Sequence, residues 1–187
     1  MSFTLRTATE EDLPALRELM ALAIDTLQHG FLSAEQIVAS RAVMGLDTQL
    51  IADRTYFMVE EEGALAGCGG WSRRATLYGG DHSVSLREPR LLDPATEAAR
   101  VRAMYTHPSF ARRGVGRMIL DQCERAAAAE GFDAVELMGT MSGQPLYAAA
   151  GYRPIEEVTD MVDGVPVPLV RMRKELEASS SQRKLGS

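Results

Sequence analysis

The chain has few cysteines, no long apolar run and no secretion signal. Its two cysteines, Cys68 and Cys123, lie in apolar or helical patterns without the spacing of a metal site or a redox pair. We interpret both as buried free thiols, which fits a reducing cytoplasm. No apolar run reaches the roughly 18 residues that a membrane span needs, and residues 1–6 lack a signal-peptide pattern. We therefore expect a cytoplasmic protein without a membrane partner.

Basic residues are fewer than acidic residues, with 20 Lys and Arg against 26 Asp and Glu. The 187 residues carry a net charge of −6 and an isoelectric point near 5.2, which disfavours nucleic acid as a partner and mildly favours a cationic substrate such as an amine. The histidines, cysteines and carboxylates show no metal-ligand spacing, so no metal is predicted. With 45% hydrophobic and 25% charged residues, the sequence indicates one globular domain.

One segment is especially informative: residues 105–117, which read YTHPSFARRGVGR. It follows a segment of strand character and leads into apolar residues at helical spacing: Val115, Met118, Ile119, Cys123, Ala126 and Ala127. A helix start leaves its first N–H groups without partners, and Gly114 and Gly116 would let a bulky anion approach them. Arg112, Arg113 and Arg117 add positive charge, so the segment predicts a phosphate cradle built from the backbone.

The glycines do not fit two common phosphate motifs. No lysine stands at Walker spacing, and no third glycine completes a dinucleotide fingerprint. A strand–turn–helix corner, in which the glycines only ease the turn, explains these two residues equally well when they are considered alone.

A second motif favours the cradle. Residues 146–152 read LYAAAGY. Together the two segments resemble the GCN5-related N-acetyltransferase family, in which a strand, the motif R/Q-x-x-G-x-G/A and a helix hold the pyrophosphate of acetyl-CoA. A later short helix in that family ends in (F/Y)Y-x-x-x-G(F/Y), which residues 146–152 match. The resemblance is close over residues 100–157 and extends to the N-terminal half only in the order of elements.

Two positions depart from the family pattern. Ala111 stands where the family has Arg or Gln, and Ser142 aligns with an Asn often found before the short helix. Because the family's contacts at the first position are mostly backbone, we expect the cradle to be retained. Ser142 can still form a hydrogen bond to the cofactor arm.

The resemblance implies the residues that bind acetyl-CoA. They are Met104, Tyr105, Thr106, Arg112, Arg113, Gly114, Val115, Gly116, Arg117, Ser142 and Tyr147. Tyr147 matches the family tyrosine that protonates the leaving thiolate, and a phenol, with a pKa of about 10, is protonated at neutral pH. The alternative, which the sequence pattern alone favours, is that Tyr147 is an aromatic packing residue.

Periodicity and turn residues predict the order β-α-α-β-β-β-α-β-α-β-β. Strands are expected at residues 3–7, 56–60, 64–71, 97–104, 134–138, 152–158 and 165–172. This order indicates an α/β (α+β) fold in one domain, residues 1–175, with a mixed, mostly antiparallel sheet and helices on both faces. The resemblance implies that two central parallel strands, ending near Thr106 and Met138, splay apart. Residues 176–187 are polar and are predicted to be a disordered tail.

The acceptor is expected to meet the irregular segment at residues 73–94 and the hairpin end before it, at Trp71, Arg73, Arg74 and Tyr78. The arginine pair could hold a carboxylate or phosphate of the acceptor. A solvated loop, with Trp71 in the core, is an equally good interpretation. The general base is left open among His82, Asp81, Glu60 and Glu97.

These observations favour an acetyl-CoA-dependent N-acetyltransferase that acts by direct transfer on a small-molecule or peptide amine. A non-catalytic acyl-CoA-binding or regulatory domain is the alternative, and the presence of Tyr147 argues against it. A nucleotide-phosphate enzyme is a third option, but the lysine and Mg²⁺-ligand signatures are missing. The acceptor, the acyl-chain preference and the oligomeric state, with a homodimer as one option, stay open.

Overall fold

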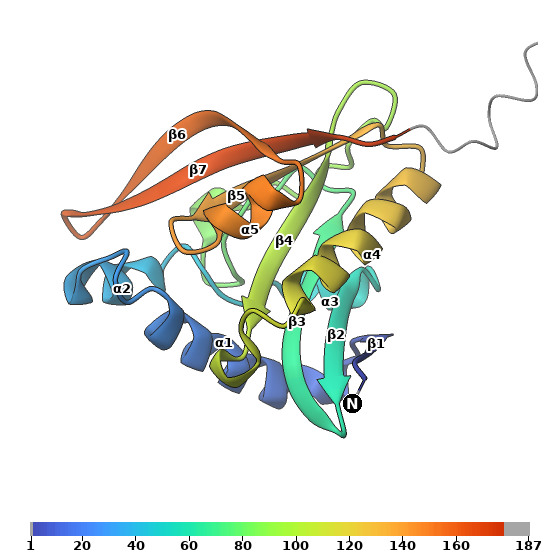
Figure 1. Cartoon of the computed structure of the whole chain (residues 1–187). Coiled ribbons are helices and arrows are strands. Elements are labelled where there is room, and N and C mark those ends of the chain that lie inside the picture. The colour runs from blue at the N-terminus through green and yellow to red at the C-terminus, as the bar shows by residue number, and fades with distance from the viewer. Residues whose placement is uncertain (1, 178–187) are drawn as a thin grey trace, which may run out of the picture.

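A seven-stranded sheet forms the centre of the protein (Figure 1). The computed structural model describes residues 2–177. The strands are β1 (Thr4–Thr7), β2 (Tyr56–Glu61), β3 (Ala64–Ser72), β4 (Ala99–Thr106), β5 (Ala134–Thr140), β6 (Arg153–Val162) and β7 (Val165–Glu175). They lie in the order β1-β2-β3-β4-β5-β7-β6, and only β4 and β5 pair in parallel. The predicted mixed, mostly antiparallel sheet is confirmed.

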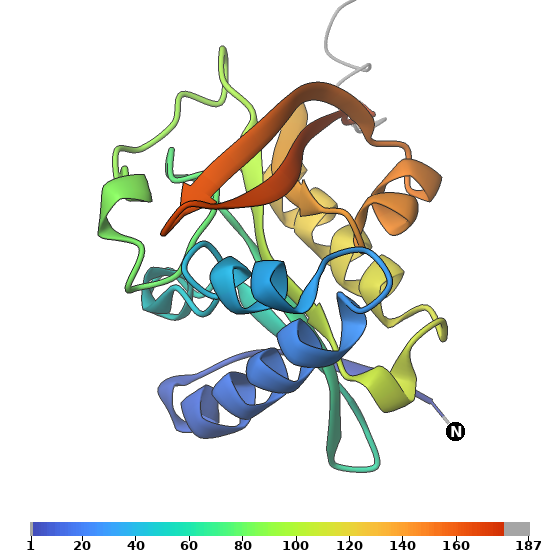
Figure 2. The ribbon, with the colours of Figure 1, turned by 90° about the vertical axis from the view of Figure 1, so that its left-hand side faces the viewer.

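Helices cover both faces of the sheet (Figures 1 and 2). They are α1 (Leu13–Leu27), α2 (Ala34–Ser40), α3 (Thr48–Ala52), α4 (Val115–Ala129) and α5 (Gln144–Ala149). Successive strand residues point to opposite faces. Tyr56 and Met58 of β2 therefore pack in a cluster with α1, whereas Phe57 and Val59 pack in a second cluster with α4.

Local sequence explains where the first helices begin. The Thr9 N–H donates to Asp12 at 2.8 Å ahead of α1, and Ser33 accepts from the Gln36 N–H at 3.1 Å at the start of α2. The predicted element order contains two helices before β2, which are α1 and α2. It does not contain α3, because five residues are too few to show a helical period; the N-cap residue Asp47 is a weak local signal.

The parallel strands β4 and β5 touch only where they begin. Their register contains two pairs, Ala99 with Val135 and Arg100 with Glu136, and the strands then diverge (Figure 1). Glu136, which is 6% exposed, accepts hydrogen bonds from Arg100 at 2.9 Å and from Arg173 at 3.1 Å, and it also contacts Arg171. This ion cluster fixes the point from which the gap opens.

The hairpin of β6 and β7 reaches over α2 (Figure 2). Ala39 and Val43 pack with Val167 and Leu169 of β7 in a small apolar cluster. The Gln36 amide also donates to the Pro166 carbonyl at 2.9 Å. The hairpin therefore closes one side of the space between the diverging strands.

Cys68 and Cys123 are free and fully buried, which confirms their interpretation as core thiols. Strand β7 ends at Glu175, and the next residue, Leu176, donates its N–H to the Asp133 carbonyl at 2.7 Å. The tail predicted from residue 176 lies outside the described residues from residue 178 onward. Within residues 2–177, no helix is long and apolar enough to cross a membrane.

Candidate active site

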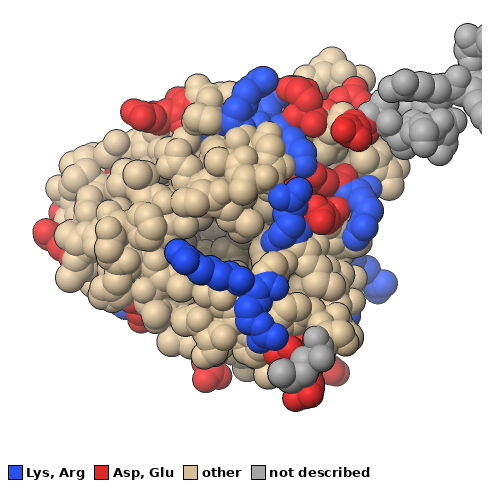
Figure 3. Space-filling view, in the orientation of Figure 1, with Lys and Arg blue, Asp and Glu red and all other residues tan. Residues whose placement is uncertain are grey.

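The gap between β4 and β5 contains a cavity of about 640 Å³. Its walls come from the second half of β4, the first turn of α4, the end of β5, α5, and the end of α1 with the segment after α2. In the space-filling view of Figure 3, the surface of the molecule has a hollow, and Lys and Arg side chains lie along the edge of that hollow. The cavity is therefore bounded by segments that are far apart in the sequence.

Strand β4 carries a bulge where it lines the cavity. Cys68 pairs with Tyr105 and Gly70 with Arg102, so two steps along β3 match three steps along β4. Ala103 has a positive φ of 51°, unusual for a residue with a Cβ. The buried Tyr56 hydroxyl donates to the Ala103 carbonyl at 2.7 Å and holds the bulge. Bulges often re-aim backbone groups beside active sites, and no sequence pattern predicted this one.

The first turn of α4 forms another wall. Gly114 precedes the helix with a φ of 84°, and no side chain within residues 2–177 caps the first helical N–H groups. A Cβ on Gly114 would meet nothing within 4 Å, whereas a Cβ on Gly116 would lie 2.6 Å from Leu146 of α5. Gly114 thus leaves the helix start open to an anion. Gly116 also lines the cavity, and a side chain there would make Leu146 shift.

The three predicted arginines are not equivalent. Arg112 and Arg117 line the cavity, and Arg112 adopts a positive φ of 62°. Arg113 points elsewhere: it donates to both carboxylate oxygens of Glu61 at 2.8 and 3.0 Å and lies over the ring of Phe3. The Arg117 guanidinium also donates to Asp121 at 3.4 Å and to the Ala149 carbonyl at 3.3 Å. Two of the three arginines therefore line the cavity, and the third does not.

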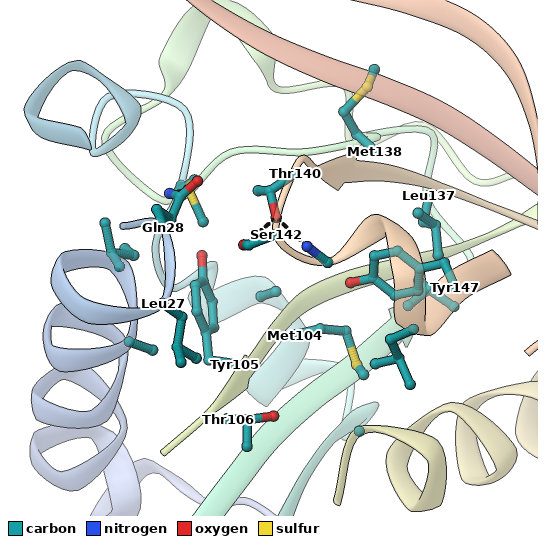
Figure 4. Close-up of a pocket in the computed structure, with 18 of the residues that line it drawn as sticks. Leu27, Gln28, Met104, Tyr105, Thr106, Leu137, Met138, Thr140, Ser142 and Tyr147 are labelled. Carbon is teal, nitrogen blue, oxygen red and sulfur yellow. Dashed lines mark hydrogen bonds between the residues drawn. The ribbon is translucent and has the colours of Figure 1, made fainter. Parts of the chain in front are cut away.

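Tyr147 projects from α5 into the cavity (Figure 4). Its ring is 8% exposed and lies edge-on to Tyr152 with centroids 6.1 Å apart. Burial raises the pKa of Tyr147 above its ordinary value near 10, so the phenol stays protonated at neutral pH. In Figure 4 its hydroxyl points toward the gap between β4 and β5. From this position the hydroxyl can donate a proton to a group bound in the gap.

Most other predicted cofactor residues also line the cavity. These are Met104, Tyr105, Thr106, Val115 and Ser142. The Ser142 and Thr140 hydroxyls are 3.2 Å apart, and Thr140 also accepts from the Gly143 N–H at 3.1 Å. Ser142 is therefore held at the cavity wall, where its hydroxyl can act as donor or acceptor.

The structure does not bring three of the four predicted acceptor residues to the cavity. Trp71 is 2% exposed and belongs to the core. Arg73 is paired with Glu130 at 2.7 Å, and Arg74 is paired with Asp53 at 2.8 Å. Only the fourth, Tyr78, lines the cavity. The placement of the two arginines has a physical cause, since each is paired with a carboxylate on a distant segment.

The four candidate bases are absent from the cavity wall too. His82 Nε2 contacts the Arg41 carbonyl, Asp81 accepts from Thr48, Glu60 accepts from Arg6, and Glu97 accepts from Arg90. The hydrogen bond from Arg90 lowers the pKa of Glu97 to about 2, which makes that carboxylate a weak base. Deprotonation of an amine in the cavity by any of the four would need an intervening group.

Sequence reasoning missed the far end of the cavity. Gln28, Phe31 and Met44, from the end of α1 and the segments beside α2, form this wall with Tyr78 and the Tyr105 ring. Figure 4 shows Gln28 and Tyr105 on the side of the cavity opposite Tyr147. Their sequence surroundings gave no signal, because each lies in an ordinary apolar stripe or at a helix end.

The comparison with protein families agrees with this architecture. The model described as "Acetyltransferase (GNAT) family" matches residues 17–152, most of the chain. The chain belongs to this acetyltransferase family. As a member, it is an N-acetyltransferase, and the resemblance carried by the two sequence motifs is confirmed.

Solved structures of the same fold span nearly the whole chain. A GCN5-related N-acetyltransferase from Rhodopseudomonas palustris is 19% identical, with a TM-score of 0.68, over 94% of this chain and 97% of its own. PaiA N-acetyltransferase from Thermoplasma acidophilum, in complex with coenzyme A, is 16% identical, with a TM-score of 0.62, over 94% and 99%. YncA from Salmonella typhimurium, with acetyl-CoA, is 16% identical, with a TM-score of 0.60, over 95% of both chains. At these identities the likeness shows a shared fold. No curated protein matches the chain significantly.

Proposed function

We propose that this acetyltransferase moves the acetyl group of acetyl-CoA directly to an amine of a small molecule or peptide, with Tyr147 as proton donor. The observation that carries the proposal is the single cavity that joins the uncapped start of α4, the Tyr147 hydroxyl and a separate apolar end. The coenzyme A and acetyl-CoA complexes of PaiA and YncA support the choice of cosubstrate.

The residues present fit the phosphate part of acetyl-CoA. The first N–H groups of α4 have no side-chain cap, and Arg112 and Arg117 add cationic groups at the same mouth of the cavity. Helix starts bind anions through such N–H groups and the helix dipole. Backbone groups of Met104, Tyr105 and Thr106 face the gap that β5 leaves open, and they would bind the pantetheine arm.

The reaction breaks the C–S bond of the thioester, forms a C–N bond, removes a proton from the amine and gives a proton to sulfur. Tyr147 is assigned the last of these steps because its phenol is protonated and projects into the gap. A backbone N–H of the bulged part of β4 would stabilise the negative charge that develops on the carbonyl oxygen. None of the four candidate bases lines the cavity, so solvent accepts the proton that the amine loses and returns a proton to the Tyr147 phenolate.

The substitution Tyr147→Phe tests the role of the hydroxyl. It keeps the ring that packs against Tyr152 and removes only an oxygen, so folding and acetyl-CoA affinity should be retained. Because a general acid acts mainly in the transition state, kcat should fall by about 10²–10⁴-fold. Release of CoA thiol in the presence of an amine panel measures kcat, and calorimetry measures the affinity.

The matched control is Tyr152→Phe, whose hydroxyl donates to Glu124 rather than to the cavity. It should leave kcat close to wild type. If Tyr147→Phe retained wild-type kcat while the chemical step was rate-limiting, Tyr147 would be a packing residue. If no amine released CoA although acetyl-CoA bound, a non-catalytic acyl-CoA-binding domain would be the better description. A cytoplasmic location stays a prediction from the free cysteines.

A further inference from the structure

The end of the cavity far from α4 contains a buried amide oxygen without a partner. Gln28 follows the last residue of α1, is 2% exposed and lines the cavity. Its Oε1 atom accepts no hydrogen bond from any described residue. Buried polar atoms are nearly always paired in native structures, so this one calls for an explanation.

The orientation of the Gln28 amide follows from its neighbours. Its nitrogen lies 3.2 Å from the Ser40 hydroxyl oxygen and 3.2 Å from the Met44 sulfur. The Ser40 hydroxyl donates its only proton to the Ile37 carbonyl at 2.7 Å, so it must accept from Gln28. A flipped amide would place an acceptor against these two acceptors. The group without a partner is therefore the oxygen.

The surroundings of Gln28 are apolar and lack negative charge. Leu27, Phe31, Met44 and Leu169 line this end, and no Asp or Glu among the described residues lines any part of the cavity. Arg102, which also lines the cavity, is 3% exposed and is already held by Asp47 at 3.1 Å and by the Gly79 carbonyl at 2.9 Å. This compartment offers little to a charged group on a ligand.

The hydroxyls of Tyr78 and Tyr105 are the other side-chain polar groups at this end among the described residues. The Tyr78 hydroxyl donates to Asp160 at 2.7 Å. The Tyr105 hydroxyl accepts from the Gly45 N–H at 2.9 Å, and no described residue accepts its proton. An amine can donate an N–H to the Gln28 amide oxygen while its lone pair stays free to attack the thioester. The unpaired Oε1 therefore matches an N–H of a neutral amine.

We propose that Gln28 determines acceptor specificity: its Oε1 binds the N–H of a primary amine carried on an apolar aliphatic or aromatic group without a neighbouring carboxylate or phosphate. This inference rests on the proposed N-acetyltransferase activity. A neutral amide oxygen suits the reaction because a carboxylate in its place would favour the ammonium form of the acceptor, which cannot attack a thioester.

Matched pairs of acceptors test the substrate class on the wild-type enzyme. One pair is 2-phenylethylamine and phenylalanine, and another is 3-methylbutylamine and leucine; each pair differs by one carboxylate. Because a carboxylate without a partner is costly to bury, kcat/KM should be at least about 10-fold higher for the amine of each pair. CoA thiol release provides the readout.

Two substitutions test Gln28 itself. Gln28→Met has similar length and shape but lacks the oxygen, and it should raise the KM of the amine about 3- to 10-fold with unchanged acetyl-CoA affinity. Gln28→Glu keeps an oxygen acceptor but adds charge, and it should move the pH profile of kcat/KM to higher pH because the carboxylate stabilises the ammonium. Gln122→Met, on α4 outside the cavity, is the control and should change neither quantity.

The outcomes separate this inference from the proposed activity. Equal or better turnover of the amino acids overturns it, as does an unchanged amine KM in Gln28→Met. If Gln28→Met does not fold, the matched pairs and Gln28→Glu still decide the question. If acetyl-CoA binds but no amine of any class is acetylated, the proposed activity fails and this inference fails with it.

Discussion

Gly114 offers a test of the phosphate site in which shape stays constant and only charge changes. The residue has a φ of 84° and precedes α4, and a Cβ there would lie in open space. Asn and Asp adopt this left-handed conformation more readily than other residues with a side chain. Gly114→Asn and Gly114→Asp should therefore share any backbone strain and differ by one negative charge.

The magnitude of the difference follows from Coulomb's law. Two unit charges about 4 Å apart interact by about 1 kcal/mol in water and about 4 kcal/mol at an effective dielectric constant of 20. Gly114 is exposed at the mouth of the cavity, so the repulsion of a bound phosphate should fall near the lower value. We expect the Asp variant to bind coenzyme A about 1–2 kcal/mol more weakly than the Asn variant, or about 5- to 30-fold in Kd.

Calorimetry of both variants with coenzyme A at two salt concentrations measures this difference. The gap between them should shrink at high salt, because the Debye length falls to about 3 Å at 1 M. Thermal unfolding should show no loss of stability in the Asp variant relative to Asn, since acidic groups at a helix start are favourable. Equal affinities at low salt would refute the placement of the phosphates at α4.

Two further predictions concern ion pairs. Although burial raises its pKa, hydrogen bonds and charge from the surrounding arginines hold the pKa of Glu136 below its usual value, so this stabilisation is present at neutral pH and is lost as the pH falls below about 4.3. Glu136→Gln should then cost about 3 kcal/mol of unfolding free energy at pH 7 and about 1 kcal/mol less at pH 3.5, because the loss is complete only below the lowered pKa of the folded state. Urea unfolding measures both values, with the exposed Glu156→Gln as control; an equal loss at both pH values would contradict this. Arg112→Ala should weaken coenzyme A binding about 3- to 10-fold, whereas Arg113→Ala, which removes a partner of Glu61, should not; equal losses in calorimetry would reject the distinction.

The sequence predicted the elements of the fold that have strong periodicity. The β2–β3 and β6–β7 hairpins and helix α4 were all expected, because alternation and helical spacing reflect burial on one face. Helix α3 was not predicted, because it is too short to show a helical period in its apolar residues. The divergence of β4 and β5 was expected only from the family resemblance. The distance between two strands depends on packing and on the Glu136 ion cluster, neither of which appears as a local pattern.

The residues of the candidate site also differ in whether a local sequence pattern could predict them. Gly114 and Tyr147 belong to motifs with fixed spacing, and both line the cavity. The interpretation of Arg73 and Arg74 used only their closeness to a hairpin end, but their partners, Glu130 and Asp53, are distant in sequence. Gln28 could not have been chosen, since a glutamine at a helix end is ordinary; only the absence of a partner for its buried oxygen distinguishes it.

The geometry of β4 explains why one cavity can serve both substrates. Beyond Arg100 the strand has a neighbour on its β3 side only, so its other edge has backbone groups that require partners. An extended, amide-containing arm can pair with that edge as a missing strand would. Such an arm, with its phosphates at α4, would carry its far end past Tyr147 toward Gln28, because these groups follow one another along the cavity (Figure 4). Arg112 and Arg117 lie near the start of α4, where water weakens their charge, and the buried, neutral amide oxygen of Gln28 lies at the other end, where burial of a charge would be costly. The polarity of the cavity therefore changes in the order in which phosphate, thioester and amine would be bound.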